Sequence, residues 1–111
     1  MSIQYLGVVT TDVAGVCASN ASSQGIEFGA PDPGLGQART AAWPAGGMIG
    51  IRAPMHDGEE PMIRPYMRVD DIEHAVAAAV AAGATLAVSP MDLLEHGQCA
   101  IVFQGDVQLG F

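Results

Sequence analysis

The sequence predicts an α+β protein built from two βαβββ modules. The second half of the chain shows the order strand, helix and three strands, the first half repeats it more faintly, and the composition is globular. Half of the 111 residues are hydrophobic and 14% are charged, which is unlike a disordered chain. A chain of this length forms one domain. We expect module 1 at about residues 1–54 and module 2 at about residues 61–111.

The clearest predicted element is a helix in the segment VDDIEHAVAAAVAAG. Asp70 and Glu73 form a variant of the capping box at its start, and Gly83 is a suitable stop. Four apolar residues fall at helical spacing and form one apolar face: Ile72, Val76, Ala79 and Val80. The strands predicted around this helix cover residues 63–69, 85–88, 98–104 and 107–111.

The first half predicts the same order, with a strand in IQYLGVVTT, a helix in DVAGVCASNASSQ and strands in IEF, QARTAAW and GMIGIR. Three residue pairs are separated by the same number of positions: Asp12 and Asp71, Val13 and Ile72, Pro31 and Pro90. A duplicated supersecondary unit leaves such matches. The first helix contains glycine, serine and asparagine, which weaken helices, so we expect it to be partly frayed or irregular.

Two linkers separate these elements, GAPDPGLG and APMHDGEEP. Proline, glycine and acidic residues make the second linker, residues 53–61, the hinge between the modules. No regular spacing of metal ligands accompanies its acids, so we expect Asp57, Glu59 and Glu60 to lie in a solvated loop.

The charge of the chain limits its partners. The formal net charge is −8 and the four basic residues are all arginines, which makes nucleic acid a poor partner and excludes Schiff-base chemistry on lysine. No apolar run reaches the ~18 residues of a membrane span, and the first ten residues lack a basic signal region. We expect a cytoplasmic protein. Cys17 and Cys99 form no CxxC motif and are expected to be free thiols.

Two of the four arginines stand in the segment RPYMRVDD. Because a strand turns successive side chains to opposite faces, Arg64, Tyr66 and Arg68 are expected to share one face of the sheet. A central arginine that points inward needs a partner, since an unpaired buried charge is costly.

The segment PYMRVDDIEHAVAAAVAAGATLAVSPMDLLEHGQCAIV resembles the vicinal oxygen chelate superfamily, which includes glyoxalase I, bleomycin resistance proteins and extradiol dioxygenases. The segments VVTTDV and GIEFGAPDP extend the resemblance into the first half. The resemblance implies that the curved mixed sheets of the two modules enclose a cleft. In metal-dependent members, the first and last strands of each module hold a divalent ion.

The four positions that correspond to those metal ligands are Tyr5, Gly50, Arg64 and Gly110. Glycine has no ligand atom in a side chain, and a guanidinium has no electron pair to donate. We therefore expect neither a metal nor another cofactor.

Residues two positions away on the same strands would also face the cleft. The candidate ligand-binding residues are Tyr5, Trp43, Met48, Arg52, Arg64, Tyr66, Arg68 and His96. Their arginines favour an anionic ligand. His56 and His74 are expected to be solvated.

Alternatives stay open for several of these residues. Arg52 and Arg68 could extend into water or pair with Asp12, Asp70 or Asp71, and Arg64 could pair with Glu27 or Asp106. The tyrosines, Trp43 and Met48 could be ordinary packing residues.

The leading hypothesis for the function is a metal-free small-molecule binding protein of the glyoxalase and bleomycin-resistance type, acting as a homodimer on an anionic ligand. One alternative is an enzyme of the same superfamily with an altered site: either a metal-dependent lyase or dioxygenase with displaced ligands, or an isomerase that uses Tyr5, Tyr66 or His96 as acid and base. Another is a protein–protein module whose cleft has closed.

Overall fold

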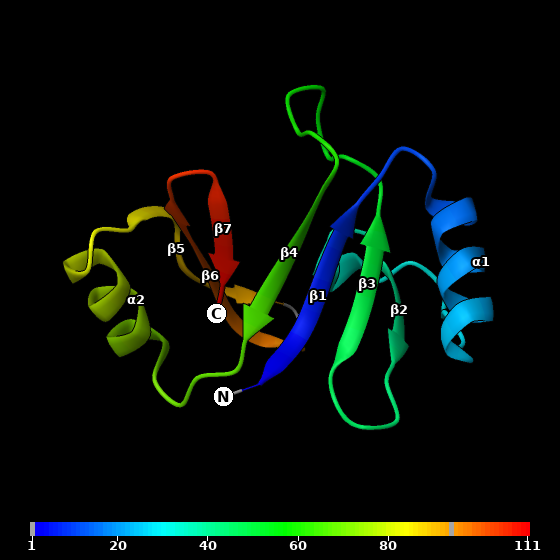
Figure 1. Ribbon diagram of the computed structural model, residues 1–111, viewed down its shortest axis with the longest axis horizontal. Coiled ribbons are helices and arrows are strands. Elements are labelled where there is room, and N and C mark those ends of the chain that lie inside the picture. The colour runs from blue at the N-terminus through cyan, green and yellow to red at the C-terminus, as the bar shows by residue number, and fades with distance from the viewer. Residues whose placement is uncertain (1, 94) are drawn as a thin grey trace.

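In residues 2–93 and 95–111, which the computed structural model describes, seven strands form one mixed sheet that does not close (Figure 1). The strands are β1 (Ile3–Val9), β2 (Arg39–Ala42), β3 (Met48–Arg52), β4 (Met62–Met67), β5 (Thr85–Leu93), β6 (Gly97–Gln104) and β7 (Val107–Gly110). The helices are α1 (Val13–Gln24), α2 (Ile72–Ala81) and the short 3₁₀ helix η1 (Pro33–Leu35). The predicted α+β fold is confirmed.

The order of the strands in the sheet is β2-β3-β1-β4-β7-β6-β5. In each module the first strand pairs in parallel with the last, β1 with β3 and β4 with β7. The two first strands pair antiparallel, with Tyr5 opposite Tyr66, Leu6 opposite Pro65 and Gly7 opposite Arg64. The modules therefore join through β1 and β4 within one chain, a point that the sequence left open.

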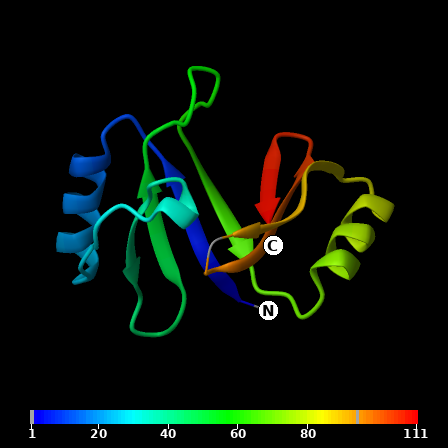
Figure 2. The same cartoon turned by 180° about the vertical axis from the view of Figure 1, so that it is seen from behind.

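The helices lie at opposite ends of the molecule, with the central strands between them (Figures 1 and 2). Cys17 of α1 packs in one buried cluster with Ile49 and Ile51 of β3. At the other end the buried residues include Val76 of α2 and Val102 of β6. Alternate residues of the same strands point to the face without helices, and that face carries the cleft.

One predicted strand is absent. Residues 26–28 have no strand pairing, although Ile26 is buried in the core. The next segment contains two prolines, which lack the N–H groups that a ladder needs. It instead covers the edge of β2 as a loop, where the Gly29 N–H donates to the Thr40 carbonyl at 2.9 Å. The first module thus has three strands in the described residues and the second has four.

Both helices differ from the predictions in detail. The expectation of a frayed α1 is wrong, because the helix runs without interruption from Val13 to Gln24. Asp12 caps its start, and Gly25 ends it in a left-handed conformation. Helix α2 is capped by Asp71, whose side chain accepts a hydrogen bond from the His74 N–H at 3.0 Å. The predicted cap, Asp70, is one residue too early.

Candidate functional site

A cavity of about 770 Å³ lies on the face of the sheet opposite the helices. Strands β1, β3 and β4 form its floor, while η1, the inter-module loop, β5, β6 and Phe111 complete the lining. Figure 2 views the molecule from the side on which η1 lies in front of β1. Seven predicted site residues line this cleft: Tyr5, Met48, Arg52, Arg64, Tyr66, Arg68 and His96. Both modules contribute to them.

Trp43 lies elsewhere. Its side chain packs against the core cluster around Cys17 and Ile49, and its indole N–H donates to the Gln24 side chain at 2.7 Å. Trp43 therefore fixes the end of α1 to the β2–β3 connection and does not line the cleft.

Two tyrosines occupy the centre of the floor. The rings of Tyr5 and Tyr66 meet edge to face, with centroids 5.7 Å apart and an interplanar angle of 73°. A Cβ atom at Gly50 would collide with the Tyr5 hydroxyl, and one at Gly110 would collide with the Tyr66 ring. The two glycines thus leave the space in which the tyrosine rings lie.

The four positions that the resemblance assigns to metal ligands lie on the neighbouring strands β3, β1, β4 and β7, but their residues do not fit a metal ion. Arg64 brings a positive charge, and tyrosine rings fill the space over Gly50 and Gly110. Elsewhere in residues 2–93 and 95–111, no group of three or more histidine, cysteine, aspartate or glutamate side chains could hold an ion. The residues at these four positions therefore do not form a metal site.

The Arg64 guanidinium contacts neutral acceptors in the described part of the chain. It donates from Nε and Nη2 to the Gln108 side-chain oxygen at 3.0 and 2.6 Å, and from Nη1 to the Tyr66 hydroxyl at 3.0 Å. The Met62 sulfur lies 3.1 Å from Nη2. Glu27 and Asp106, the acidic partners that the sequence left open as an alternative, are not among these contacts. Arg64 is therefore a positioned cation whose charge these contacts do not neutralise.

Arg52 is held differently. It forms a bidentate ion pair with Glu59 of the inter-module loop, at 2.6 and 2.8 Å. Its suggested partners Asp12, Asp70 and Asp71 are not used, and Glu59 is not the solvated loop acid that was expected. Arg52 holds the pKa of the Glu59 carboxyl down at about 2, so this carboxylate stays charged and is a poor base near neutral pH.

His96 and Asp32 meet at the cleft from different modules. His96 Nε2 lies 2.8 Å from Asp32 Oδ2, and both side chains are about one-third exposed, at 32%. The hydrogen bond from His96 holds the pKa of Asp32 below its usual value. This contact joins the η1 region to the β5–β6 connection and orients the imidazole. His56 and His74 are exposed.

Burial raises the pKa of the Tyr5 phenol to about 12, with the nearby Tyr66 adding to the effect. Tyr5 therefore keeps its proton at neutral pH and can donate a hydrogen bond into the cleft. Burial also raises the pKa of the Cys99 thiol, which lines the same cavity. The other thiol, Cys17, is buried.

The walls of the cleft are rich in methionine. Five of them line it: Met48, Met55, Met62, Met67 and Met91. Methionine is flexible and polarizable, and it adapts to apolar ligands of different shapes. Strict strand alternation from Arg64 and Tyr66 would turn Met67 away from the cleft. Strict alternation holds through Tyr66 and ends there, close to the register shift between Ile3 and Tyr5.

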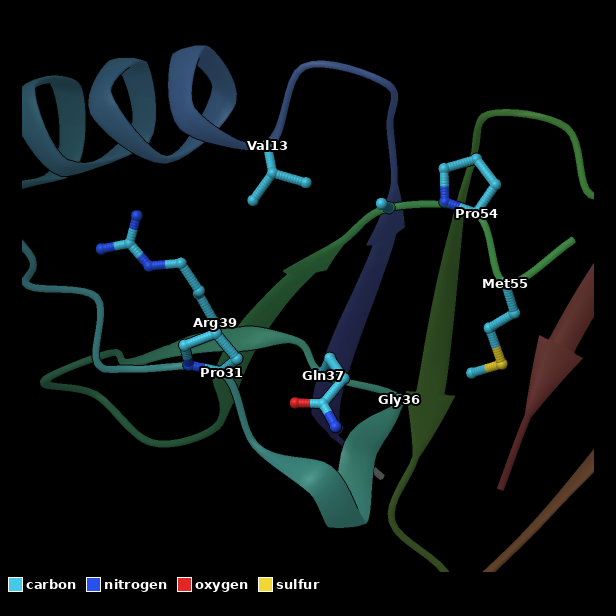
Figure 3. Close-up of a pocket in the computed structure, with 8 residues that line it drawn as sticks. Val13, Pro31, Gly36, Gln37, Arg39, Pro54 and Met55 are labelled. Atoms are coloured by element: carbon cyan, nitrogen blue, oxygen red, sulfur yellow. The ribbon is translucent and has the colours of Figure 1, made fainter.

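A second, shallower hollow of about 520 Å³ lies between the start of α1, η1 and the inter-module loop (Figure 3). Arg39 and Met55 lie on opposite sides of it in Figure 3. The Arg39 Nε donates to the Gly29 carbonyl at 3.0 Å. Arg39 thus belongs to this hollow and does not line the cleft.

Three polar residues that contact the predicted site residues were missed by the sequence analysis: Asp32 at His96, Glu59 at Arg52 and Gln108 at Arg64. Gln108 could have been found, because it is a polar residue in a short apolar strand, one position from Leu109. Asp32 and Glu59 come from loops, where strand alternation does not predict the direction of a side chain.

The paired modules and the cleft define the fold that the resemblance to the vicinal oxygen chelate superfamily predicted, and solved structures confirm it. The chain is similar to a hypothetical protein from Bacillus halodurans C-125, with 16% identity, a TM-score of 0.73 and coverage of 99% of this chain and 91% of that one. It is similar to methylmalonyl-CoA epimerase from Mycobacterium tuberculosis, with 15% identity, a TM-score of 0.74 and coverage of 97% and 84%.

A third similar structure is Streptomyces coelicolor methylmalonyl-CoA epimerase in complex with 2-nitronate-propionyl-CoA, with 14% identity, a TM-score of 0.65 and coverage of 99% of this chain and 92% of that one. At such identities the similarity shows the fold alone. No family model matches the sequence, and no curated protein matches it. Among the described residues, no helix has the length and apolar character needed to cross a membrane.

Proposed function

We propose that the protein is a metal-independent small-molecule binding protein whose cleft takes an anionic ligand with an apolar body. The observation that carries this proposal is the Arg64 guanidinium, which is held on the cleft floor by neutral acceptors. A cation in this state attracts an anion more strongly than one already paired with a carboxylate.

The geometry around Arg64 favours a carboxylate or a similar oxyanion. Gln108 accepts from Nε and Nη2 and so fixes the plane of the guanidinium. The Tyr66 hydroxyl accepts from Nη1, which leaves its own proton free to donate. Tyr5 offers a second phenol that is protonated at neutral pH, with a pKa of about 12. Donors therefore converge on the floor, as a bound oxyanion requires.

The rest of the cleft supports an apolar ligand body. Its methionines are joined by apolar residues from β5, β6 and the end of the chain: Val88, Leu93, Ile101 and Phe111. Small-molecule sites are typically apolar cavities of roughly 300–1,000 Å³ with a few polar groups that fix orientation. The cleft, at about 770 Å³, is of this kind.

The test is a pair of probes that differ in charge and share a shape. Octanoate carries a carboxylate on an apolar chain, and octanamide is its neutral counterpart. Isothermal titration calorimetry compares the wild type with Arg64→Met, which removes the charge but keeps much of the stem. Arg39→Met removes the same charge outside the cleft and is the matched control.

We expect Arg64→Met to weaken octanoate binding by about 1.5–3 kcal/mol, roughly tenfold to a hundredfold, as for hydrogen bonds to a charged group. Octanamide binding should change little, and Arg39→Met should behave as wild type. Equal octanoate affinity in the wild type and in Arg64→Met would refute the proposal. So would an equal loss in Arg39→Met, because the effect would then come from net charge alone.

A second candidate function is a metal-independent isomerase, which is favoured by the His96–Asp32 contact at the cleft. A histidine oriented by a carboxylate is a suitable general base, and Tyr5 is a suitable proton donor. Because two of the similar structures are methylmalonyl-CoA epimerases, the substrate to try first is methylmalonyl-CoA. Exchange of its α-proton in deuterated water with a chelator present, and loss of exchange in His96→Gln, would establish this activity. If the α-proton does not exchange, the isomerase proposal is wrong for this substrate and the binding function is kept.

We also propose that the protein acts as a homodimer in the cytoplasm. Ile63 of β4 and Val107 of β7 are 65% and 67% exposed. Their strands are joined where Tyr66 pairs with Gly110, and strand alternation turns both side chains away from the cleft. Such exposed apolar pairs favour association. Cys17 and Cys99 are free thiols, which suits a reducing compartment.

A further inference from the structure

We propose that Glu59 determines the charge selectivity of the cleft. Its carboxylate occupies Arg52 as a built-in anion, so the cleft accepts ligands with one negative charge and disfavours ligands with two. The inference rests on the proposed function, because it assumes that Arg64 anchors the first anionic group of the ligand.

The contact between Glu59 and Arg52 has the form that a bound carboxylate would take. Nη1 of Arg52 donates to Oε1 of Glu59 at 2.6 Å, and Nη2 donates to Oε2 at 2.8 Å. The two side chains are only 14% and 17% exposed, and both line the cleft. Bidentate pairing is the preferred geometry between arginine and a carboxylate. A carboxylate of the protein thus fills a position suited to one from a ligand.

The loop holds Glu59 at this position. The Met55 N–H donates to the same carboxylate oxygen that Nη1 contacts, at 2.8 Å. The turn that carries Glu59 is closed by a hydrogen bond from its N–H to the His56 carbonyl at 3.1 Å. A ligand that displaced Glu59 would have to break these contacts as well as the ion pair.

The two arginines are close enough to serve one ligand. Arg52 lies opposite Val9 of β1, and Arg64 lies opposite Gly7 of the same strand, so one strand separates them. With strands ~4.8 Å apart and residues rising ~3.4 Å, their Cα atoms are roughly 12 Å apart. Arg64 contacts the Tyr66 hydroxyl, and both arginines line the same cleft. A short dicarboxylate could therefore span both guanidinium groups.

Only one of the two cations is neutralised by an acid in these contacts. A ligand with a single carboxylate pairs with Arg64 and places its apolar body among the methionines. The second carboxylate of a dianion would meet, at Arg52, the like charge of a Glu59 carboxylate that already occupies this arginine, which is unfavourable. Removing the charge of Glu59 should therefore make Arg52 available to it.

The experiment compares octanoate with suberate, which has the same chain length and a second carboxylate at the other end. Glu59→Gln keeps the shape of the side chain and an oxygen that can accept from Met55, but it carries no charge. Glu60→Gln makes the same change of net charge at the next, exposed position and is the matched control. The quantity measured is the ratio of the octanoate Kd to the suberate Kd, by calorimetry at fixed ionic strength.

We expect the wild type and Glu60→Gln to prefer octanoate. In Glu59→Gln the octanoate Kd divided by the suberate Kd should rise by roughly tenfold or more, because suberate gains one carboxylate–arginine pair. If Glu59→Gln does not fold, Glu59→Asp is the second variant. Its shorter side chain reaches Arg52 less well, so the same ratio should rise by a smaller factor. An unchanged ratio in the variant that folds, or an equal change in Glu60→Gln, overturns the inference.

The two proposals fail in different ways. If octanoate binds equally well to the wild type and Arg64→Met, the proposed anion site is wrong whatever Glu59 does. If Arg64→Met weakens octanoate binding but the Glu59 variants leave the Kd ratio unchanged, the proposed anion site at Arg64 is supported and only the proposed role of Glu59 is wrong.

Discussion

Two glycines shape the floor of the cleft at the scale of single residues. The Tyr66 ring lies over Gly110, and the Tyr5 hydroxyl lies over Gly50. The atoms that a Cβ at Gly110 would meet include Cγ of Tyr66. This atom is close to the backbone and cannot move away by a small rotation of a side-chain tip. The aromatic pair and the glycines therefore depend on one another.

We predict that Gly110→Ala lowers the free energy of unfolding by about 1–3 kcal/mol, the usual cost of overpacking. Chemical denaturation at neutral pH measures it. Gly29→Ala is the control, because a Cβ there would meet only the Thr40 carbonyl, at an ordinary 3.9 Å. In a Tyr66→Ala background, Gly110→Ala should cost much less. An equal cost in both backgrounds would show that the ring is not the cause.

Strand alternation predicted the direction of several residues correctly from sequence. Arg64 and Tyr66 are on the cleft side, as their spacing in RPYMRVDD indicated. The pairing of Arg64 with Gln108 could not be predicted, because the two residues lie on strands distant in sequence, and the pairing of Arg52 with Glu59 could not, because Glu59 comes from a loop. Trp43 was named as a candidate ligand-binding residue with packing as the alternative, and the structure packs it against the core around α1.

At the scale of elements, α2 begins one residue later than the sequence pattern indicated. A capping-box pattern selects Asp70 with Glu73, whereas the hydrogen bond in the structure runs from the His74 N–H to Asp71. We predict that Asp71→Ala costs about 1 kcal/mol of stability, as the loss of an N-cap usually does. Asp70→Ala should cost less than about 0.5 kcal/mol. Thermal or chemical denaturation measures both losses of stability. A larger loss in Asp70→Ala than in Asp71→Ala would show that Asp70 is the cap.

The inter-module loop provides a prediction about pH. The pKa of Glu59 is lowered from 4.5 to about 2 in the folded protein. A lowered pKa stabilises the fold above the unfolded-state pKa, and this stabilisation is lost as the pH falls through the folded-state value. At pH 7, Glu59→Gln should cost on the order of 1–2 kcal/mol, between the values for exposed and buried ion pairs.

The difference in unfolding free energy between the wild type and Glu59→Gln should therefore shrink as the pH falls from 4.5 toward 2. Urea denaturation of both proteins across this interval measures it. A difference that stays constant with pH would mean that Glu59 acts through its shape or its hydrogen bond to Met55, and not through its charge.

The helices and most strands could be predicted because their signals are local. Alternating apolar residues, a cap and a stop are all contained in the segment itself. The failures have tertiary causes. The first helix is weak by propensity, but Asp12 caps it and Trp43 is bonded to its last residue. Residues 26–28 have strand-like composition, but the following loop pairs with the edge of β2 instead.

At the scale of the whole molecule, the face opposite the cleft carries Ile63 and Val107, which are well exposed. We predict a symmetric homodimer at micromolar concentration, since such a pair of apolar residues gains from being covered by a second copy. Light scattering coupled to size exclusion measures the mass. Ile63→Asp combined with Val107→Asp should shift the protein to monomer, and a monomeric wild type would contradict the prediction.

The central claim is that Arg64 anchors an anion in a cleft shared by both modules. The most direct measurement is a crystal structure of the protein with octanoate bound. The account predicts the carboxylate within hydrogen-bonding distance of the Arg64 guanidinium, the alkyl chain among the methionines, and Glu59 still paired with Arg52. A carboxylate bound at Arg39 in the second hollow, or a cleft without octanoate at concentrations that saturate binding in solution, would contradict it.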